Sequence, residues 1–174
     1  MDMIHSVWGG LHTIAAILGL ITGFMVLRRP KGDRQHKSVG YVYVVSMSVL
    51  VLAGIPMAEN GLSAFHYLSM ITGGSIVGAM VMIWLARIQT DPRKRANFVF
   101  GHYKFMVWSY IGLVAAGVAQ IASRIAGEAG GMASFWRAVL VASLVITGVG
   151  ALWVRLSDPG IKRRYARALD GGAS

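Results

Sequence analysis

Five histidines are the residues of this chain best suited to chemistry, because imidazole ligates metals, donates hydrogen bonds and titrates near neutral pH. His12 lies inside an apolar segment, where an ionisable side chain is a functional candidate by default. His36 and His102 each stand near the start of an apolar segment beside basic residues, and His66 opens a further one. For His5, a hydrogen bond to a loop or a lipid headgroup is favoured over ligation.

Pairs of these histidines predict a redox site. Two imidazoles from neighbouring helices at one depth ligate a b-type haem, and two haems at different depths carry electrons across a bilayer. The segment order places His12 and His66 near one membrane surface and His36 and His102 near the other. The leading hypothesis is therefore a b-cytochrome-like protein for transmembrane electron transfer with histidine-ligated haem, working with a quinone or a membrane redox partner.

Two other functions stay open. The chain would alternatively be a non-enzymatic binding or assembly module that holds a lipid, a quinone or a partner helix, with the histidines as hydrogen-bond donors. A metal site built from the outer histidines is the third hypothesis, although few carboxylates accompany them. Whether the protein is an enzyme, and whether it forms a homo-oligomer, is left open.

The elements that must position the histidines are membrane helices. Of the 174 residues, 55% are hydrophobic and 14% charged, which is far more apolar than a soluble domain. The apolar residues form blocks of about twenty, the length that crosses a bilayer as a helix. We expect an all-α integral membrane bundle of five transmembrane helices in one domain (1–158), followed by a basic tail (159–174). The predicted spans are Ser6–Leu27, Val39–Ala58, Ala64–Ala86, Gly101–Ser123 and Ala133–Val154.

Basic residues predict the orientation of the bundle. All but Arg124 and Arg137 of the seventeen lysines and arginines flank the first loop, the third loop or the tail. The positive-inside rule then places the N-terminus outside and the C-terminus in the cytoplasm, in the inner membrane of a bacterium. The net charge of +10 is explained by these flanks, so no nucleic-acid partner is expected. Without cysteines, disulfides and thiolate metal sites are excluded.

Small residues accompany the histidines along two segments. In the first segment they recur with spacings of three and four, so they share one helical face. Such a face serves close helix packing, or leaves room for a flat ligand beside each histidine. This set is His5, Gly9, His12, Ala16, Gly19 and Gly23; the matching set in the fourth segment is His102, Phe105, Ser109, Gly112 and Ala116.

Two short motifs resemble a known family. "HKSVGYVYV" from His36 resembles the pattern His-basic-x-x-Gly-x-x-Tyr, and "HYKFMVWSY" from His102 resembles His-x-basic-x-Met-x-x-Ser-Tyr. Together with "GGLHTIAAILGLITG", they are similar to the predicted membrane proteins of domain-of-unknown-function family 2306, over roughly residues 5–125. The resemblance implies a small helical membrane protein with motif histidines at His12, His36 and His102, and it implies no activity. At Trp108 the family leads us to expect a basic residue.

Overall fold

The computed structural model describes residues 7–57 and 64–170, and within this part every regular element is helical. Helix α1 spans Val7–Arg28 and α2 spans Arg34–Gly54, which runs into a 3₁₀ turn, η1, at Ile55–Met57. Helix α3 spans Ala64–Ile88, and α4 spans Pro92–Asp170. Within these described ranges, four helices are long and apolar enough to cross a membrane, which confirms the predicted all-α membrane architecture.

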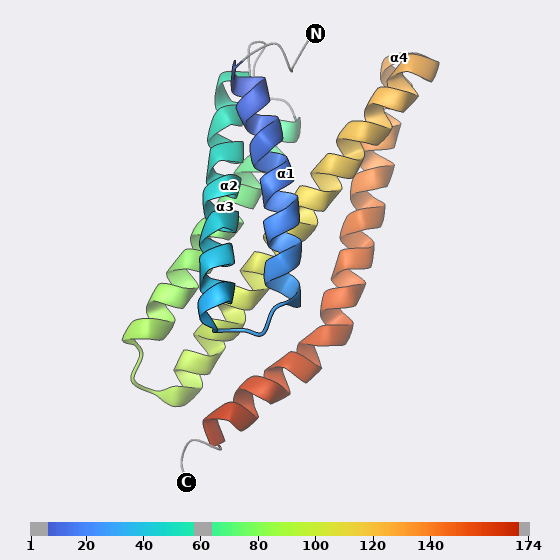
Figure 1. The fold of residues 1–174 in the computed structure, drawn as a ribbon. Coiled ribbons are helices and arrows are strands. Elements are labelled where there is room, and N and C mark those ends of the chain that lie inside the picture. Colours follow the sequence, from blue (N-terminus) through green and yellow to red (C-terminus); the bar gives the residue numbers. More distant parts are fainter. Residues whose placement is uncertain (1–6, 58–63, 171–174) are drawn as a thin grey trace.

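Helix α4 is interrupted at Gly131, whose backbone has φ 71° and ψ −164°. Positive φ is tolerated by glycine because it has no Cβ, and here it lets the chain double back (Figure 1). The first half of α4 (92–130) and its second half (132–170) then lie alongside each other. Gly150 faces Ile111 so closely that a Cβ on it would lie 2.8 Å from that side chain. The predicted spans Gly101–Ser123 and Ala133–Val154 both fall within α4, one in each half.

Polar residues determine where two helices begin. Asp33 caps α2 by accepting a hydrogen bond from the backbone N–H of His36. Asp91 caps α4 in the same way, accepting from the N–H of Arg93 at 2.9 Å. The first turns of α2 and α4 are polar, so a prediction based on apolar segments did not include them. Helix α2 therefore starts at Arg34 instead of Val39, and α4 at Pro92 instead of Gly101.

The turns 29–33 and 89–91 lie at the same end of the bundle as the C-terminal end of α4 (Figure 1). These three segments, with the helix turns next to them, carry most of the lysines and arginines, and we call this the basic end. The outer surface of the helices is apolar: the side chain of Leu144 is 71% exposed and that of Ile71 is 67% exposed. Such a surface is the one that lipid covers in a membrane helix bundle.

The helices pack as two hairpins. In the first hairpin, α1 and α2 are joined by a hydrogen bond between His12 Nδ1 and the Leu50 carbonyl. In the second hairpin, α3 packs on the first half of α4, where Gly78 leaves just enough room for the ring of Phe105. An apolar cluster from all four helices then holds the hairpins together. Its buried members are Ala15, Tyr43, Met47, Leu50, Ile76, Ala79, Met106 and Leu113.

Candidate ligand-binding site

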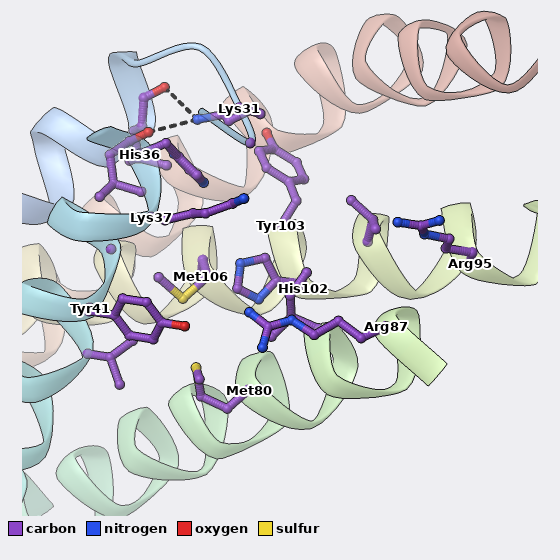
Figure 2. A pocket seen from close by; sticks show the side chains of 17 residues that line it. Lys31, His36, Lys37, Tyr41, Met80, Arg87, Arg95, His102, Tyr103 and Met106 are labelled. Carbon is purple, nitrogen blue, oxygen red and sulfur yellow. Dashed lines mark hydrogen bonds between the residues drawn. The ribbon is translucent and has the colours of Figure 1, made fainter. Parts of the chain in front are cut away.

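A cavity of about 460 Å³ lies between the two hairpins at the basic end (Figure 2). The end of α1, the start of α2, the end of α3 and the start of α4 all contribute to its wall. Among the described residues that line it there is no aspartate or glutamate. Its cationic side chains are Lys31, Lys37, Arg87 and Arg95, and its imidazoles are those of His36 and His102. A concave site with this charge attracts an anion.

His102 reaches the cavity from the first half of α4 and is held in a defined orientation. Its Nδ1 lies 2.8 Å from the carbonyl oxygen of Ala79 on α3. A carbonyl only accepts hydrogen bonds, so Nδ1 carries the proton and donates. In the neutral ring this leaves Nε2 with a lone pair for a ligand. The hydrogen bond also ties α3 to α4 next to the cavity.

His36 reaches the same cavity from the first turn of α2. Its Nδ1 is buried and makes no hydrogen bond of ordinary geometry within the part of the chain that the structure describes, although the ring interacts with the backbone of Val26. An unsatisfied buried nitrogen costs free energy that a bound water or ligand would recover. His36 and His102 come from different hairpins, so a group bound between them would bridge the hairpins.

Lys31 stands at the rim of the cavity, in the turn between α1 and α2. Its ammonium donates hydrogen bonds to the carbonyls of Val26 at 2.8 Å and Leu27 at 3.0 Å, which closes the C-terminal end of α1 (Figure 2). Partial burial lowers the pKa of Lys31 below its usual value, because desolvation disfavours the charged form. An anion placed beside this ammonium would favour the charged form again.

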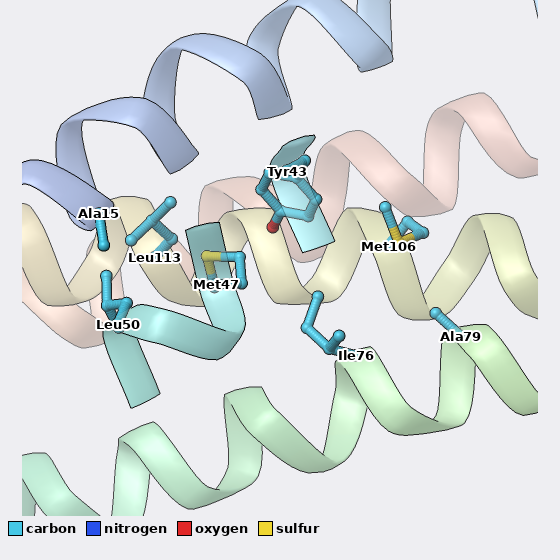
Figure 3. Packing of buried hydrophobic residues seen from close by; sticks show 8 residues of the cluster. All are labelled: Ala15, Tyr43, Met47, Leu50, Ile76, Ala79, Met106 and Leu113. Carbon is cyan, nitrogen blue, oxygen red and sulfur yellow. The ribbon is translucent and has the colours of Figure 1, made fainter. Parts of the chain in front are cut away.

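A buried hydrogen bond joins the two motif segments. Tyr43 and Ser109 stand seven residues further along α2 and α4 than His36 and His102, on the same helical faces, and their hydroxyls lie 2.8 Å apart. Ser109 donates its own proton to the Met106 carbonyl, so Tyr43 is the donor in this pair. The apolar cluster continues below them (Figure 3). Both motifs therefore join the two hairpins: their histidines line the cavity, and their hydroxyls bond to each other two helical turns further along.

The predicted outer site is only partly described. His12 is half-buried and bonded to α2, and α1 packs mainly on α2 and α4. His66 lies in the first turn of α3 with its side chain outside the described residues, and His5 lies outside them altogether. The pairing of His12 with His66 therefore stays a prediction. Within the described residues, no cluster of three or more histidines or carboxylates is placed to hold a metal ion.

Sequence reasoning found the two histidines of the cavity but missed its cations. Lys31, Lys37, Arg87 and Arg95 were explained by topology alone, since basic residues flank membrane helices for that reason. What distinguishes these four is that they converge from both hairpins on one cavity, which no local pattern reveals. Gly40 also lines the cavity, and the sequence indicated its importance only as the glycine of the His36 motif.

Comparisons with known proteins agree with this architecture. Neither the curated proteins nor the solved structures give a match to the chain. The family described as "Predicted membrane protein (DUF2306)" matches residues 9–155, which include both motif segments and the whole lining of the cavity. The chain therefore belongs to the DUF2306 family of predicted membrane proteins.

Proposed function

We propose that this protein is a membrane-embedded binding protein that holds an anionic ligand in the cavity at its basic end. The observation that carries the proposal is the convergence of four cationic side chains from both hairpins on a cavity with no carboxylate among its described lining residues. Basic residues that only set topology have no need to surround a shared cavity. Here they do so next to two imidazoles.

The arrangement suits an anion that bridges the hairpins. Lys31 and Lys37 approach from the first hairpin, and Arg87 and Arg95 from the second. Guanidinium groups bind carboxylate or phosphate oxygens in pairs, while the lysines act as point charges. Without an anion the four cations repel one another, so a bound anion is expected to stabilise the fold.

Thermal unfolding of the purified protein in a neutral detergent tests this proposal. The probes are phosphatidylglycerol, haemin and inorganic phosphate, with phosphatidylcholine as the zwitterionic reference. At least one anion should raise the Tm, and Arg87→Gln together with Lys37→Gln should weaken its binding at least tenfold. The matched control is Arg124→Gln with Arg137→Gln, which removes two cations that do not line the cavity. Equal binding in both double variants would contradict the proposal.

A b-type haem is the second candidate, and one observation favours it. His36 and His102 come from different hairpins and line the same cavity, and the Nδ1 bond of His102 leaves its Nε2 for an iron. The haem propionates would meet the same cations, and a bound haem would supply one-electron chemistry. Reduced-minus-oxidised spectra of protein from haem-replete cells test this. A Soret band lost in His36→Ala and His102→Ala but kept in His12→Ala is expected, and a colourless protein after added haemin would exclude it.

A quinone would behave differently in the same assays. Its headgroup is uncharged, so its binding should depend on His102 and Tyr41 but not on Arg87 or Lys37. A quinone analogue that binds equally well to the Arg87→Gln and Lys37→Gln double variant would favour this ligand over an anion. A membrane redox partner follows only from the haem or quinone outcome.

The topology is also part of the proposal. The two halves of α4 would cross the membrane separately, which makes five spans, with the N-terminus outside and the C-terminus in the bacterial cytoplasm. The distribution of lysine and arginine supports this orientation. A fluorescent-protein fusion after Ser174 should be bright, and an alkaline-phosphatase fusion after Gly131 should be active. The reverse pattern would invert the topology.

A further inference from the structure

We infer that the ligand is a lipid with an anionic headgroup, whose apolar chain passes Gly40 and leaves the cavity between α2 and α3. The inference rests on the proposed anion site and adds the chemical class of its ligand. Two features carry it: the cavity wall changes from cationic to apolar along each helix, and Gly40 is a helical glycine in that wall with no close neighbour in the chain.

The wall is graded in the direction of the membrane interior. On α2 the lining residues Lys37, Tyr41 and Val44 follow one another at helical spacing, from charged to apolar. On α3 the same order appears in Arg87, Ile83 and Met80, read toward the other end of the bundle. A free phosphate would need only the charged level. An amphiphile needs both levels: the charged level at the membrane surface for its headgroup, and the apolar level further inside for its chain.

Gly40 lies on α2 between the charged and apolar levels. A glycine in a helix interior costs roughly 1 kcal/mol relative to alanine, so some close neighbour usually explains it. At some helical glycines of this bundle that neighbour is evident: a Cβ on Gly23 would lie 2.8 Å from the ring of Tyr43, and one on Gly78 would lie 3.0 Å from Phe105. At Gly40 a Cβ would meet nothing within 4 Å, and its φ is negative. Other described helical glycines are equally open, but of these Gly40 is the one that lines the cavity: the others are Gly10, Gly74, Gly117, Gly148 and Gly160. The space that it leaves open belongs to the cavity.

The hairpins separate toward the basic end, which provides the exit for the chain. Away from that end α2 and α3 are in contact, since a Cβ on Gly73 would lie 3.4 Å from Val51. Toward the basic end α3 leans away from α2 (Figure 1), and the cavity fills the space between them. Tyr41, on this side, is 51% exposed. An acyl or prenyl chain held against Gly40 would therefore reach lipid directly.

The test uses the full-length protein and native mass spectrometry from a neutral detergent. Dioleoyl phosphatidylglycerol is the main probe, and inorganic phosphate and glycerol phosphate, at a hundredfold higher concentration, are the competitors without a chain. The variant Gly40→Leu fills the cavity at a position where no protein atom is near. Gly148→Leu is the matched control, because Gly148 is also helical and open to 4 Å but exposed and outside the cavity.

The wild type and Gly148→Leu should retain one phosphatidylglycerol that neither competitor displaces. Gly40→Leu should fold with an unchanged Tm in the absence of lipid and lose at least tenfold in affinity for this lipid. Displacement by inorganic phosphate, or equal binding in the two leucine variants, would overturn the inference. In that case a remaining loss of binding in the Arg87→Gln and Lys37→Gln double variant would keep the anion site. If that double variant also bound normally, the proposed function itself would fail.

Discussion

The hydroxyl of Tyr43 on α2 lies 2.8 Å from the hydroxyl of Ser109 on α4, and both side chains are about 1% exposed. This bond crosses from one hairpin to the other. The hydroxyl of Ser109 donates its proton to the Met106 carbonyl, so in the bond between the two hydroxyls Tyr43 is the donor and Ser109 the acceptor. Each of the two residues stands seven positions after a histidine of the site, so the bond and the histidines share one pair of helical faces.

Removing either hydroxyl should weaken the contact between the hairpins. Tyr43→Phe and Ser109→Ala should each lower the free energy of unfolding by about 0.5–1 kcal/mol, the range for hydrogen bonds between membrane helices. The double variant should cost less than the sum of the two, since both single changes remove the same bond. Denaturation in mixed detergent micelles measures the three values. Strict additivity would mean that the bond contributes nothing.

Gly23 should tolerate no side chain. A Cβ there would overlap the ring of Tyr110 and lie 2.8 Å from that of Tyr43. Gly23→Ala should therefore destabilise the protein by about 1–3 kcal/mol, as overpacking does in other cores. Gly10→Ala, on the same helix with nothing within 4 Å, should be neutral or slightly stabilising. A comparison of their Tm values in the same detergent checks this, and equal values would contradict the packing found around Gly23.

The two nitrogens of His102 should have separable roles. Asparagine can place an amide N–H near the position of Nδ1, so His102→Asn should keep the bond to the Ala79 carbonyl and most of the stability. The same variant lacks Nε2 and should bind the cavity ligand at least tenfold more weakly. His102→Ala should lose both. Measuring Tm and ligand affinity for the two variants separates the roles, and normal binding by His102→Asn would make the residue a purely structural one.

Ligand affinity should fall with rising alkaline pH, and at a lower pH than an exposed lysine would cause. Burial lowers the pKa of Lys31, so this ammonium loses its proton at a lower pH than an exposed lysine does, and an anion binds only the charged form well. Lys31→Arg should keep its affinity across the same window, because arginine stays protonated. An identical decline in both proteins would assign the effect to another group. The other charged or titratable groups around the cavity are Asp33, His36, Lys37, Tyr41, Arg87, Arg95, His102 and Tyr103.

The ion pair between Lys104 and Asp158 should matter locally and little overall. It joins the two halves of α4 near the basic end with a nitrogen–oxygen distance of 3.0 Å. Both side chains are partly exposed, so Asp158→Asn should cost less than about 1 kcal/mol, and high salt should reduce the difference. Hydrogen exchange should accelerate around residue 155 in this variant and stay unchanged in Glu128→Gln. Faster exchange throughout α2 would show that the pair supports more than its own helix.

By itself the sequence determined that this is an all-helical membrane protein with its basic residues at one end. Segment length and charge distribution are local properties, and the thickness of the bilayer and the positive-inside rule act on them directly. It also singled out His36 and His102 through their motifs. Only the tertiary structure decided that these two line one cavity, that four cations line it with them, and that Tyr43 bonds Ser109. These contacts join residues on different helices, and their pairing depends on how the hairpins pack. The open space beside Gly40 also depends on how the helices pack, so the sequence alone could not predict it.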